Sequence, residues 1–478
     1  MAVLDHLEPK SVFHYFEELC SMPHGSGNTK LVSDWLVSFA RERSLEYYQD
    51  ELNNVIIIKE ATPGYEDAEP VILQGHMDMV CEQAPDCTKD MAAEGLDLAV
   101  EGDTVLARGT TLGGDDGIAV AIMLAALDDA ELAHPRMECI FTVDEETGMD
   151  GAMGLDVSML KGRRLLNLDS EVEGIFTVSC AGGNMTTCTL PISRTDFDGT
   201  VLTVTVSGLL GGHSGAEIHK ERANANMVMG RVLCAMSGRT EMRLISVDGG
   251  LKDNAIPVSA VAVVSVSDPD SAMALVEEMD AALRVEYCVT DPGIRVNAEE
   301  SGKGVPMDRA STEKIICLLT CAPNGIQAMS ADIQGLVQTS LNLGILATGY
   351  TEVEASFCVR SSVESQKEML VDRLNCLVGQ LGGHISVAGD YPGWQYRQES
   401  PLRDLLTEVF TEQYGHAPRV EAIHAGLECG LFCGKLPGLD CVSVGPDLDE
   451  IHTFRERLHI ASTQRLWAMV TEALRRMK

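Results

Sequence analysis

Short apolar runs alternate with amphipathic stretches along most of the chain. The stripe of Val12, Phe13, Phe16 and Leu19 predicts a helix over residues 11–20, and a second stripe around Trp35 predicts another. Short apolar runs predict buried strands at 55–58, 71–74, 138–143, 165–168 and 441–444, and residues 118–127 predict a long apolar helix. Because these strands alternate with helices, we expect an α/β fold whose central sheet is mostly parallel and covered on both faces.

The pattern changes in the middle of the chain. Strands are expected at 201–207, 258–266 and 353–359, and amphipathic helices at 271–283 and 366–381. A strand followed by a helix occurs twice, which indicates a weak internal repeat. We therefore expect a first domain over residues 1–185 and 396–478, interrupted by an inserted α+β domain over residues 186–395. Helices at 402–414 and 463–477 would complete the first domain.

The length and composition of the chain limit what the protein can bind and where in the cell it can be located. A chain of 478 residues favours two domains, and its formal charge of −36 would repel phosphate backbones and anionic lipid. The longest apolar run, Gly117–Leu127, is too short to cross a bilayer, which needs about 20 residues. The first 21 residues contain no signal-peptide core. We expect a cytoplasmic protein that binds neither nucleic acid nor membrane, with its fifteen cysteines reduced.

Acidic and imidazole side chains follow several of the predicted strands. His76 and Asp78 come directly after residues 71–74, and residues two apart in an extended segment project to the same face. In parallel sheets, ligands bind beyond the carboxyl ends of the strands. We therefore expect one crevice to collect the following side chains: His76, Asp78, Asp115, Glu145, Glu146, Asp169 and His452.

This mixture of carboxylates and imidazoles suits zinc, manganese or cobalt. Five ligands with one shared carboxylate could hold two ions about 3.5–4 Å apart. The adjacent Glu145 and Glu146 point in different directions, so one can bind metal while the other acts as a base. Each feature alone has a simpler explanation, such as helix capping by Asp115 and Asp116. Their joint placement at strand ends favours a metal site.

Five ordered motifs carry a resemblance to a known family. They are Gln74-Gly-His-Met-Asp-Met-Val80, Thr111-Leu-Gly-Gly-Asp-Asp-Gly-Ile118, Asp144-Glu145-Glu146-Thr-Gly148, Asn167-Leu-Asp-Ser-Glu171 and His424-Ala-Gly-Leu-Glu428. Together they resemble the di-zinc exopeptidases, which include carnosinases, and within them the branch of bacterial aminoacyl-histidine dipeptidases. The resemblance covers nearly the whole chain.

The resemblance implies a role for each strand-end residue. His76 and Asp169 would bind one zinc ion, Glu146 and His452 the other, and Asp115 would bridge both, with manganese or cobalt as alternatives. A cis peptide would follow the bridging aspartate, between Asp115 and Asp116. Asp78 would orient His76, and Glu145 would carry a proton from the bridging water to the leaving amine.

The inserted domain resembles the family's lid. His213, in Gly212-His213-Ser-Gly215, would reach the substrate carbonyl, although a histidine beside three glycines is otherwise typical of a turn. Asn254, Arg360 and Gly426 match positions that hold the substrate's carboxylate, and a solvated arginine is an equally good explanation of Arg360. The family often dimerises through this lid, so we expect a homodimer.

Two departures from the wider family fit the aminoacyl-histidine dipeptidase branch. Gly117 replaces a common lysine, and His424-Ala-Gly-Leu replaces a glycine-glycine-threonine loop. His459 competes with His452 as the last ligand. We favour His452 because it follows a strand and a Gly-Pro loop, and because Glu456 comes four residues later, as in the family.

The leading hypothesis is a cytoplasmic metallodipeptidase that hydrolyses small peptides. A preference for Xaa-His dipeptides, including carnosine-like substrates, comes from the resemblance alone, since no residue of the sequence identifies an imidazole pocket. One alternative is an amidohydrolase of the same family that removes an acyl group from an amino acid. The other is a metal-binding protein without catalysis.

Overall fold

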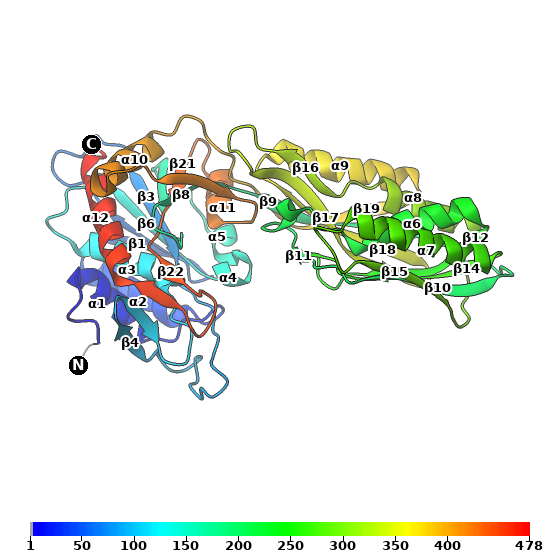
Figure 1. Cartoon of the computed structure of the whole chain (residues 1–478). Coiled ribbons are helices and arrows are strands. Elements are labelled where there is room, and N and C mark those ends of the chain that lie inside the picture. The colour runs from blue at the N-terminus through cyan, green and yellow to red at the C-terminus, as the bar shows by residue number, and fades with distance from the viewer. Residues whose placement is uncertain (1–2) are drawn as a thin grey trace. The chain divides into compact units, whose positions relative to one another are not determined.

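The computed structural model describes residues 3–478, which divide into two compact units (Figure 1). The first unit contains the chain up to Ser179 together with residues 396–422 and 427–478, and the second contains residues 180–395 and 423–426. The boundaries at 185/186 and 395/396 stay a prediction about which parts fold independently. Within residues 3–478, no helix is both long and apolar enough to cross a membrane.

The first unit is built on an eight-stranded sheet with the order β1-β2-β6-β3-β7-β21-β8-β20. Its four central strands are parallel, namely β6 (Met137–Thr142), β3 (Val71–His76), β7 (Arg164–Asn167) and β21 (Asp440–Ser443). β1 (Glu46–Gln49) and β2 (Val55–Lys59) run antiparallel to their neighbours, β8 (Ile175–Cys180) runs antiparallel to β21, and β20 (Arg419–Ile423) forms an edge. The predicted mostly parallel sheet is therefore confirmed at its centre.

The apolar helix of the first unit is α3 (Gly114–Asp128), in which every residue from Gly114 to Leu127 is buried. It packs against β3 and against α1 (Lys10–Cys20). Gly75 permits this approach, because a Cβ atom there would lie 2.5 Å from Oδ2 of Asp116 and 2.6 Å from Cβ of Ala119. The remaining helices of the unit are α2 (Lys30–Glu42), α4 (Glu145–Gly148), α5 (Asp150–Gly154), α10 (Pro401–Tyr414), α11 (Glu428–Lys435) and α12 (Ile460–Arg476).

A small second sheet holds the C-terminal loop of the first unit. Its order is β22-β23-β5-β4, formed by Leu448–Asp449, Arg457–His459, Thr104–Ala107 and Leu98–Glu101. β22 and β23 pair antiparallel, and β23 pairs with β5. The loop between β22 and β23 contains His452, so this sheet fixes both ends of the segment that contains this histidine.

The second unit contains a nine-stranded antiparallel sheet, green to yellow in Figure 1. Its order is β15-β10-β14-β12-β17-β18-β9-β19, with β16 (Gly325–Met329) paired to β17. The strands are β15 (Arg295–Glu300), β10 (Thr200–Ser207), β14 (Ala260–Val266), β12 (Met242–Gly249), β17 (Val337–Thr348), β18 (Glu352–Ser361), β9 (Gly182–Pro191) and β19 (His384–Tyr391). A separate pair joins β11 (Gly212–His213) to β13 (Ala255–Ile256), and the short 3-10 helix η1 (Ile218–Lys220) follows β11 in the chain.

The two halves of this sheet have the same topology. One half runs β10-α6-β12-β14-α7-β15 and the other β9-α8-β17-β18-α9-β19, with helices α6 (Ala225–Arg239), α7 (Pro269–Glu286), α8 (Arg309–Cys321) and α9 (Glu364–Gln380). In each half the first strand lies between the third and the fourth, and β12 joins β17 at the centre. The predicted internal repeat is therefore confirmed.

Candidate active site

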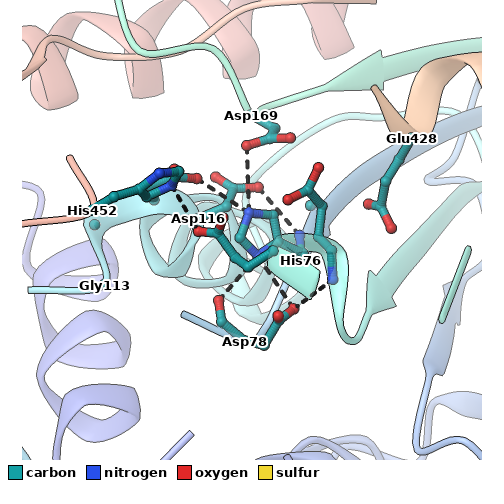
Figure 2. A network of polar contacts seen from close by, with 12 residues as sticks. His76, Asp78, Gly113, Asp116, Asp169, Glu428 and His452 are labelled. Atoms are coloured by element: carbon teal, nitrogen blue, oxygen red, sulfur yellow. Dashed lines mark hydrogen bonds and ion pairs between the residues drawn. The ribbon is translucent and has the colours of Figure 1, made fainter. Parts of the chain in front are cut away.

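The acidic and imidazole side chains of the first unit meet at the carboxyl edge of its sheet (Figure 2). His76 ends β3, the glutamate pair follows β6, and Asp169 follows β7. These strands are parallel and in register, with His76 opposite Thr142 and Gln74 opposite Asn167. Their carboxyl ends therefore lie at one edge, as the sequence pattern predicts.

His76 contacts carboxylates through both ring nitrogens. Nε2 lies 3.1 Å from Oδ1 of Asp115 and 3.6 Å from Oδ1 of Asp169. Nδ1 lies 3.0 Å from the backbone oxygen of Asp78 and 3.4 Å from its Oδ1. Asp78 therefore fixes the ring so that Nε2 faces the other two carboxylates.

Asp115 also faces the second imidazole. Its Oδ2 lies 3.1 Å from Nε2 of His452, and the same nitrogen lies 3.0 Å from Oε1 of Glu146. One oxygen of Asp115 is thus directed at His76 and the other at His452. This is the arrangement in which one carboxylate can bridge two metal ions.

Three overlapping groups of side chains in residues 3–478 have donor atoms within 4.8 Å of one another. They are Asp115 with Glu146 and His452, His76 with Asp116 and Asp169, and His76 with Glu145 and Glu146. Asp116 was not among the predicted ligands. Its Oδ2 accepts a hydrogen bond of 3.3 Å from the backbone nitrogen of His76. The only sequence feature that could have indicated Asp116 as a ligand was its position directly after Asp115. The cis peptide expected between Asp115 and Asp116 is present.

The competing histidine lies elsewhere. His459 is in β23, and its Nε2 lies 2.8 Å from Oδ2 of Asp449. It belongs to none of the three groups found among the described residues. His452 is therefore the histidine that contacts Asp115 and Glu146.

The charges at this edge suit a cation. Burial lowers the pKa of His76, but the carboxylates of Asp115, Asp169 and Asp78 raise it well above its usual value. A hydrogen bond to Asp115 and the adjacent carboxylate of Glu146 raise the pKa of His452 to about 10. Burial, together with the negative charges of Glu146 and Asp115, raises the pKa of Glu145 to about 7.

One oxygen at the site has no hydrogen-bond donor. Oε1 of Glu146 is buried and lacks a hydrogen bond, although it lies 3.0 Å from Nε2 of His452, whose hydrogen bond goes to Asp115. Six carboxylates surround two imidazoles here: Asp78, Asp115, Asp116, Glu145, Glu146 and Asp169. Uncompensated buried charge is costly. This oxygen-rich set with two imidazoles fits divalent metal ions.

Asp78 contacts both the ring of His76 and the backbone of Glu145. Its Oδ2 accepts a hydrogen bond of 2.7 Å from Oγ of Ser26, and its Oδ1 accepts one of 3.2 Å from the backbone nitrogen of Glu145. The side chain is buried. A single carboxylate therefore orients the ring of His76 and the start of the helix that contains Glu145.

A buried polar network that was not predicted from the sequence surrounds Gln74, two residues before His76. Oε2 of Glu428 accepts hydrogen bonds of 2.6 Å from Gln74 and 2.7 Å from Thr142, and Asn167 donates to Gln74 at 2.7 Å. Burial and the negative charge of Glu145 raise the pKa of Glu428 to about 8. The motif His424–Glu428 marked this region, but nothing in the pattern indicated which partners it contacts.

The candidate substrate residues all belong to the second unit. His213 is in β11, opposite Ala255 of β13, and the backbone oxygen of Asn254 accepts a hydrogen bond of 2.8 Å from Ser214. Nδ1 of His213 accepts backbone hydrogen bonds from Gly215 at 3.2 Å and Ala216 at 3.0 Å. Burial and the nearby Arg360 lower the pKa of His213, so the ring is neutral and Nε2 carries its proton. That nitrogen is a hydrogen-bond donor.

Arg360 is a buried cation without a carboxylate partner among residues 3–478. It lies on β18 in register with Ser340 and Gly183, and its guanidinium donates a hydrogen bond of 3.2 Å to the hydroxyl of Tyr391. Its Nε has no hydrogen-bond partner. A buried guanidinium with free donors suits a carboxylate ligand. No pattern in the sequence indicated Tyr391.

The loop over residues 423–426 borders the same arginine. Nε2 of His424 lies 2.7 Å from Oγ of Ser340, and the oxygen of Ala425, beside Gly426, accepts a hydrogen bond of 3.0 Å from Ala181. A Cβ atom on Gly215 would lie 3.0 Å from Cε1 of His213, 3.1 Å from Nε of Arg360 and 2.4 Å from the oxygen of His424. His213, Arg360 and this loop therefore lie together around Gly215.

The chain is similar to known peptidases over nearly its whole length. The chain is 36% identical over 484 residues to the cytosol non-specific dipeptidase of Escherichia coli K12, covering 99% of each chain. The crystal structure of an aminoacylhistidine dipeptidase from Vibrio alginolyticus superposes with a TM-score of 0.94 at 35% identity, over 98% of this chain and 97% of the other. An aminopeptidase from Bacillus cereus shares the fold at 15% identity, with a TM-score of 0.58 over 98% and 99% of the two chains.

The family match covers most of the sequence. Residues 72–476 match the family described as peptidase family M20/M25/M40. The fold class and the family resemblance predicted from the sequence motifs are thereby confirmed. The chain belongs to the peptidase family M20/M25/M40.

Proposed function

We propose that this member of the peptidase family hydrolyses dipeptides at a pair of divalent metal ions, most simply zinc. The observation that carries the proposal is the position of Asp115, whose two carboxylate oxygens lie 3.1 Å from Nε2 of His76 and 3.1 Å from Nε2 of His452. His76 and Asp169 would hold one ion, Glu146 and His452 the other, and Asp115 both. Once bound, the ions would polarise a carbonyl and provide a hydroxide at neutral pH.

Glu145 is proposed as the proton carrier. A carboxylate oxygen of this residue lies within 4.8 Å of donor atoms of His76 and Glu146, and its backbone nitrogen is held by Asp78. It would accept a proton from the attacking water and donate it to the leaving amine, which requires a carboxylate that changes protonation near neutral pH. Asp78 would act by positioning both His76 and Glu145.

His213 is proposed to stabilise the negative charge that develops on the substrate's carbonyl oxygen. The two backbone amides at Nδ1 leave the proton of the neutral ring on Nε2, which is thereby a fixed hydrogen-bond donor. Arg360 would bind the carboxylate at the C-terminus of the substrate, assisted by Asn254 and the backbone at Gly426. A required carboxylate favours short peptides over internal bonds of long chains.

The proposed substrate class is based on the names of two relatives. Two proteins at 35–36% identity over nearly their whole length are named as a non-specific dipeptidase and an aminoacylhistidine dipeptidase. We propose dipeptides, including Xaa-His and carnosine-like β-alanyl dipeptides, as substrates. The name of the Escherichia coli relative also supports a cytoplasmic location.

The test is a digest of a dipeptide library by the purified chain, with and without a chelator. We expect hydrolysis that includes Ala-His, is abolished by the chelator and returns when zinc is added. N-acyl amino acids are assayed in parallel. Cleavage of these compounds in preference to dipeptides would replace the proposal with an amidohydrolase, and metal binding without cleavage of either class would replace it with a non-catalytic metal-binding protein.

We also propose a homodimer that forms through the second unit. β19 is an edge strand whose residues are mostly exposed, and an edge strand can pair with a second copy. Light scattering of the purified chain should give twice the mass of one chain. Val387→Lys, on this edge, should shift the mass towards one chain. A wild type with the mass of one chain would rule out the dimer.

A further inference from the structure

Glu456 holds the turn that precedes the bridging aspartate. Its side chain is buried, and its carboxylate accepts four backbone hydrogen bonds. Oε2 accepts from Leu112 at 2.8 Å and Gly113 at 3.0 Å. Oε1 accepts from Gly114 at 2.7 Å and Asp115 at 3.3 Å. One side chain therefore binds four consecutive amides.

These amides need such a partner. The first N–H groups of a helix have no acceptor within the helix, and a negative charge at that end is favourable. Gly113 has a left-handed backbone with a φ of 66°, which turns the chain into α3. A Cβ atom at Gly113 would lie 2.8 Å from Sδ of Met79. The turn is therefore confined both by close packing and by the carboxylate of Glu456.

The same residue is tied to the second imidazole. Glu456 lies four residues after His452, in the loop between β22 and β23, and its backbone nitrogen donates a hydrogen bond of 3.1 Å to Thr453. The carboxylate thus connects the loop that contains His452 to the backbone of Asp115. Across this connection, Nε2 of His452 lies 3.1 Å from Oδ2 of Asp115.

We propose that Glu456 is a positioning residue that sets the distance between Asp115 and His452, and thereby the affinity of the metal position that these two residues share with Glu146. This inference rests on the proposed function only in taking a divalent metal ion as the ligand. Glu456 binds backbone amides alone, so its effect on the ion is indirect. Partners that orient ligands in this way change metal affinity by about 10–100-fold.

The chain offers a matched control. Glu138 is also a buried carboxylate that accepts backbone hydrogen bonds, from Lys161 at 3.0 Å and Gly162 at 3.0 Å. It lies near the start of β6, opposite Ile72, whereas His76 lies opposite Thr142 at the other end of that strand. Glu138 also accepts a hydrogen bond of 3.0 Å from Nε of Arg136, so Glu138→Gln weakens a buried ion pair as well as backbone contacts, at a distance from the ligands.

The experiment compares the metal-free wild type with Glu456→Gln and Glu138→Gln. Glutamine keeps the shape but turns an NH₂ group towards two of the N–H donors. Each protein is titrated with cobalt(II), followed by calorimetry and by the visible absorption of the bound ion, and its thermal midpoint is measured without metal. We expect Glu456→Gln to bind at least one cobalt ion about 10–100-fold more weakly. Glu138→Gln should lower the thermal midpoint and leave cobalt affinity within about threefold of wild type.

Glu456→Asp provides a second variant if Glu456→Gln does not fold, because the shorter acid keeps the charge and cannot span all four amides. It should also weaken cobalt binding. Wild-type cobalt affinity in a folded Glu456 variant would overturn the proposal, and so would an equal loss of affinity in Glu138→Gln. A wild type that binds cobalt but cleaves no peptide would contradict the proposed function alone. A wild type that binds no cobalt would overturn both.

Discussion

Nε2 of His452 lies 3.1 Å from Oδ2 of Asp115, although the two residues are 337 positions apart in the sequence. The other oxygen of the same carboxylate faces His76. Asp115 therefore joins two halves of a site that come from distant segments of one unit. The consequences of this arrangement can be tested residue by residue.

Asp115→Asn should weaken both metal positions. The amide keeps the size of the side chain but loses the charge and one oxygen ligand that the two ions would share. We expect bound zinc after dialysis to fall well below that of wild type and dipeptide hydrolysis to fall by roughly 10²-fold or more. Asp103→Asn, at an exposed position, is the control and should match wild type. Full zinc content in Asp115→Asn would refute the bridging role.

Stability of the metal-free protein should depend on pH through His452. Its pKa is raised from 6.5 to about 10 in the folded protein, so its protonated form stabilises the fold fully below pH 6.5. That contribution is lost as the pH rises through about 10. The thermal midpoint of metal-free protein should therefore fall between pH 6.5 and 10, and less so in His452→Gln. Parallel curves for the two proteins would contradict this assignment.

Arg360→Lys should raise the KM for dipeptides by roughly 10–100-fold, because lysine cannot reproduce a paired contact with a carboxylate. Wild type should discriminate against dipeptide amides, which lack that carboxylate, and the variant should discriminate less. Tyr391→Phe should act in the same direction but more weakly, since it removes one hydrogen bond to the guanidinium. Arg231→Lys, at an exposed ion pair, is the control. Unchanged discrimination in Arg360→Lys would rule out carboxylate binding there.

His213→Phe should lower kcat by roughly 10²–10³-fold with a small change in KM, because the proposed contact would form mainly with the developing oxyanion. The ring's Nε2 donor is removed while an aromatic side chain remains. His416→Phe, an exposed histidine, should keep wild-type kinetics. A variant of His213 with wild-type kcat would show that this side chain does not act on the carbonyl.

Local pattern predicts the residues at strand ends well. Strand β3 runs two residues beyond the predicted end, to His76, and the helix predicted from Ile118 begins at Gly114. These shifts do not change which side chains lie at the carboxyl edge of the sheet, because the period of a strand and the parallel order of β6, β3 and β7 determine that edge.

Contacts between segments that are distant in the sequence could not be predicted from the local pattern. The hydrogen bonds from Gln74 and Thr142 to Glu428, and from Arg360 to Tyr391, depend on how strands and loops meet in three dimensions. The hydrophobic periodicity of a helix or strand carries no information about these hydrogen bonds. Asp116 was overlooked because an aspartate at a helix start has an ordinary capping role. The antiparallel outer strands of the first sheet were likewise not visible in the alternation of strands and helices.

The most direct test of the central claim is the rate of Ala-His hydrolysis by wild type and Glu145→Gln, each loaded with zinc. If Glu145 carries the proton at a metal site, the variant should keep its zinc and its thermal midpoint but lose roughly 10²–10⁴-fold in kcat. Glu131→Gln, at an exposed position, should hydrolyse the peptide as wild type does. Wild-type turnover by zinc-loaded Glu145→Gln would contradict the account.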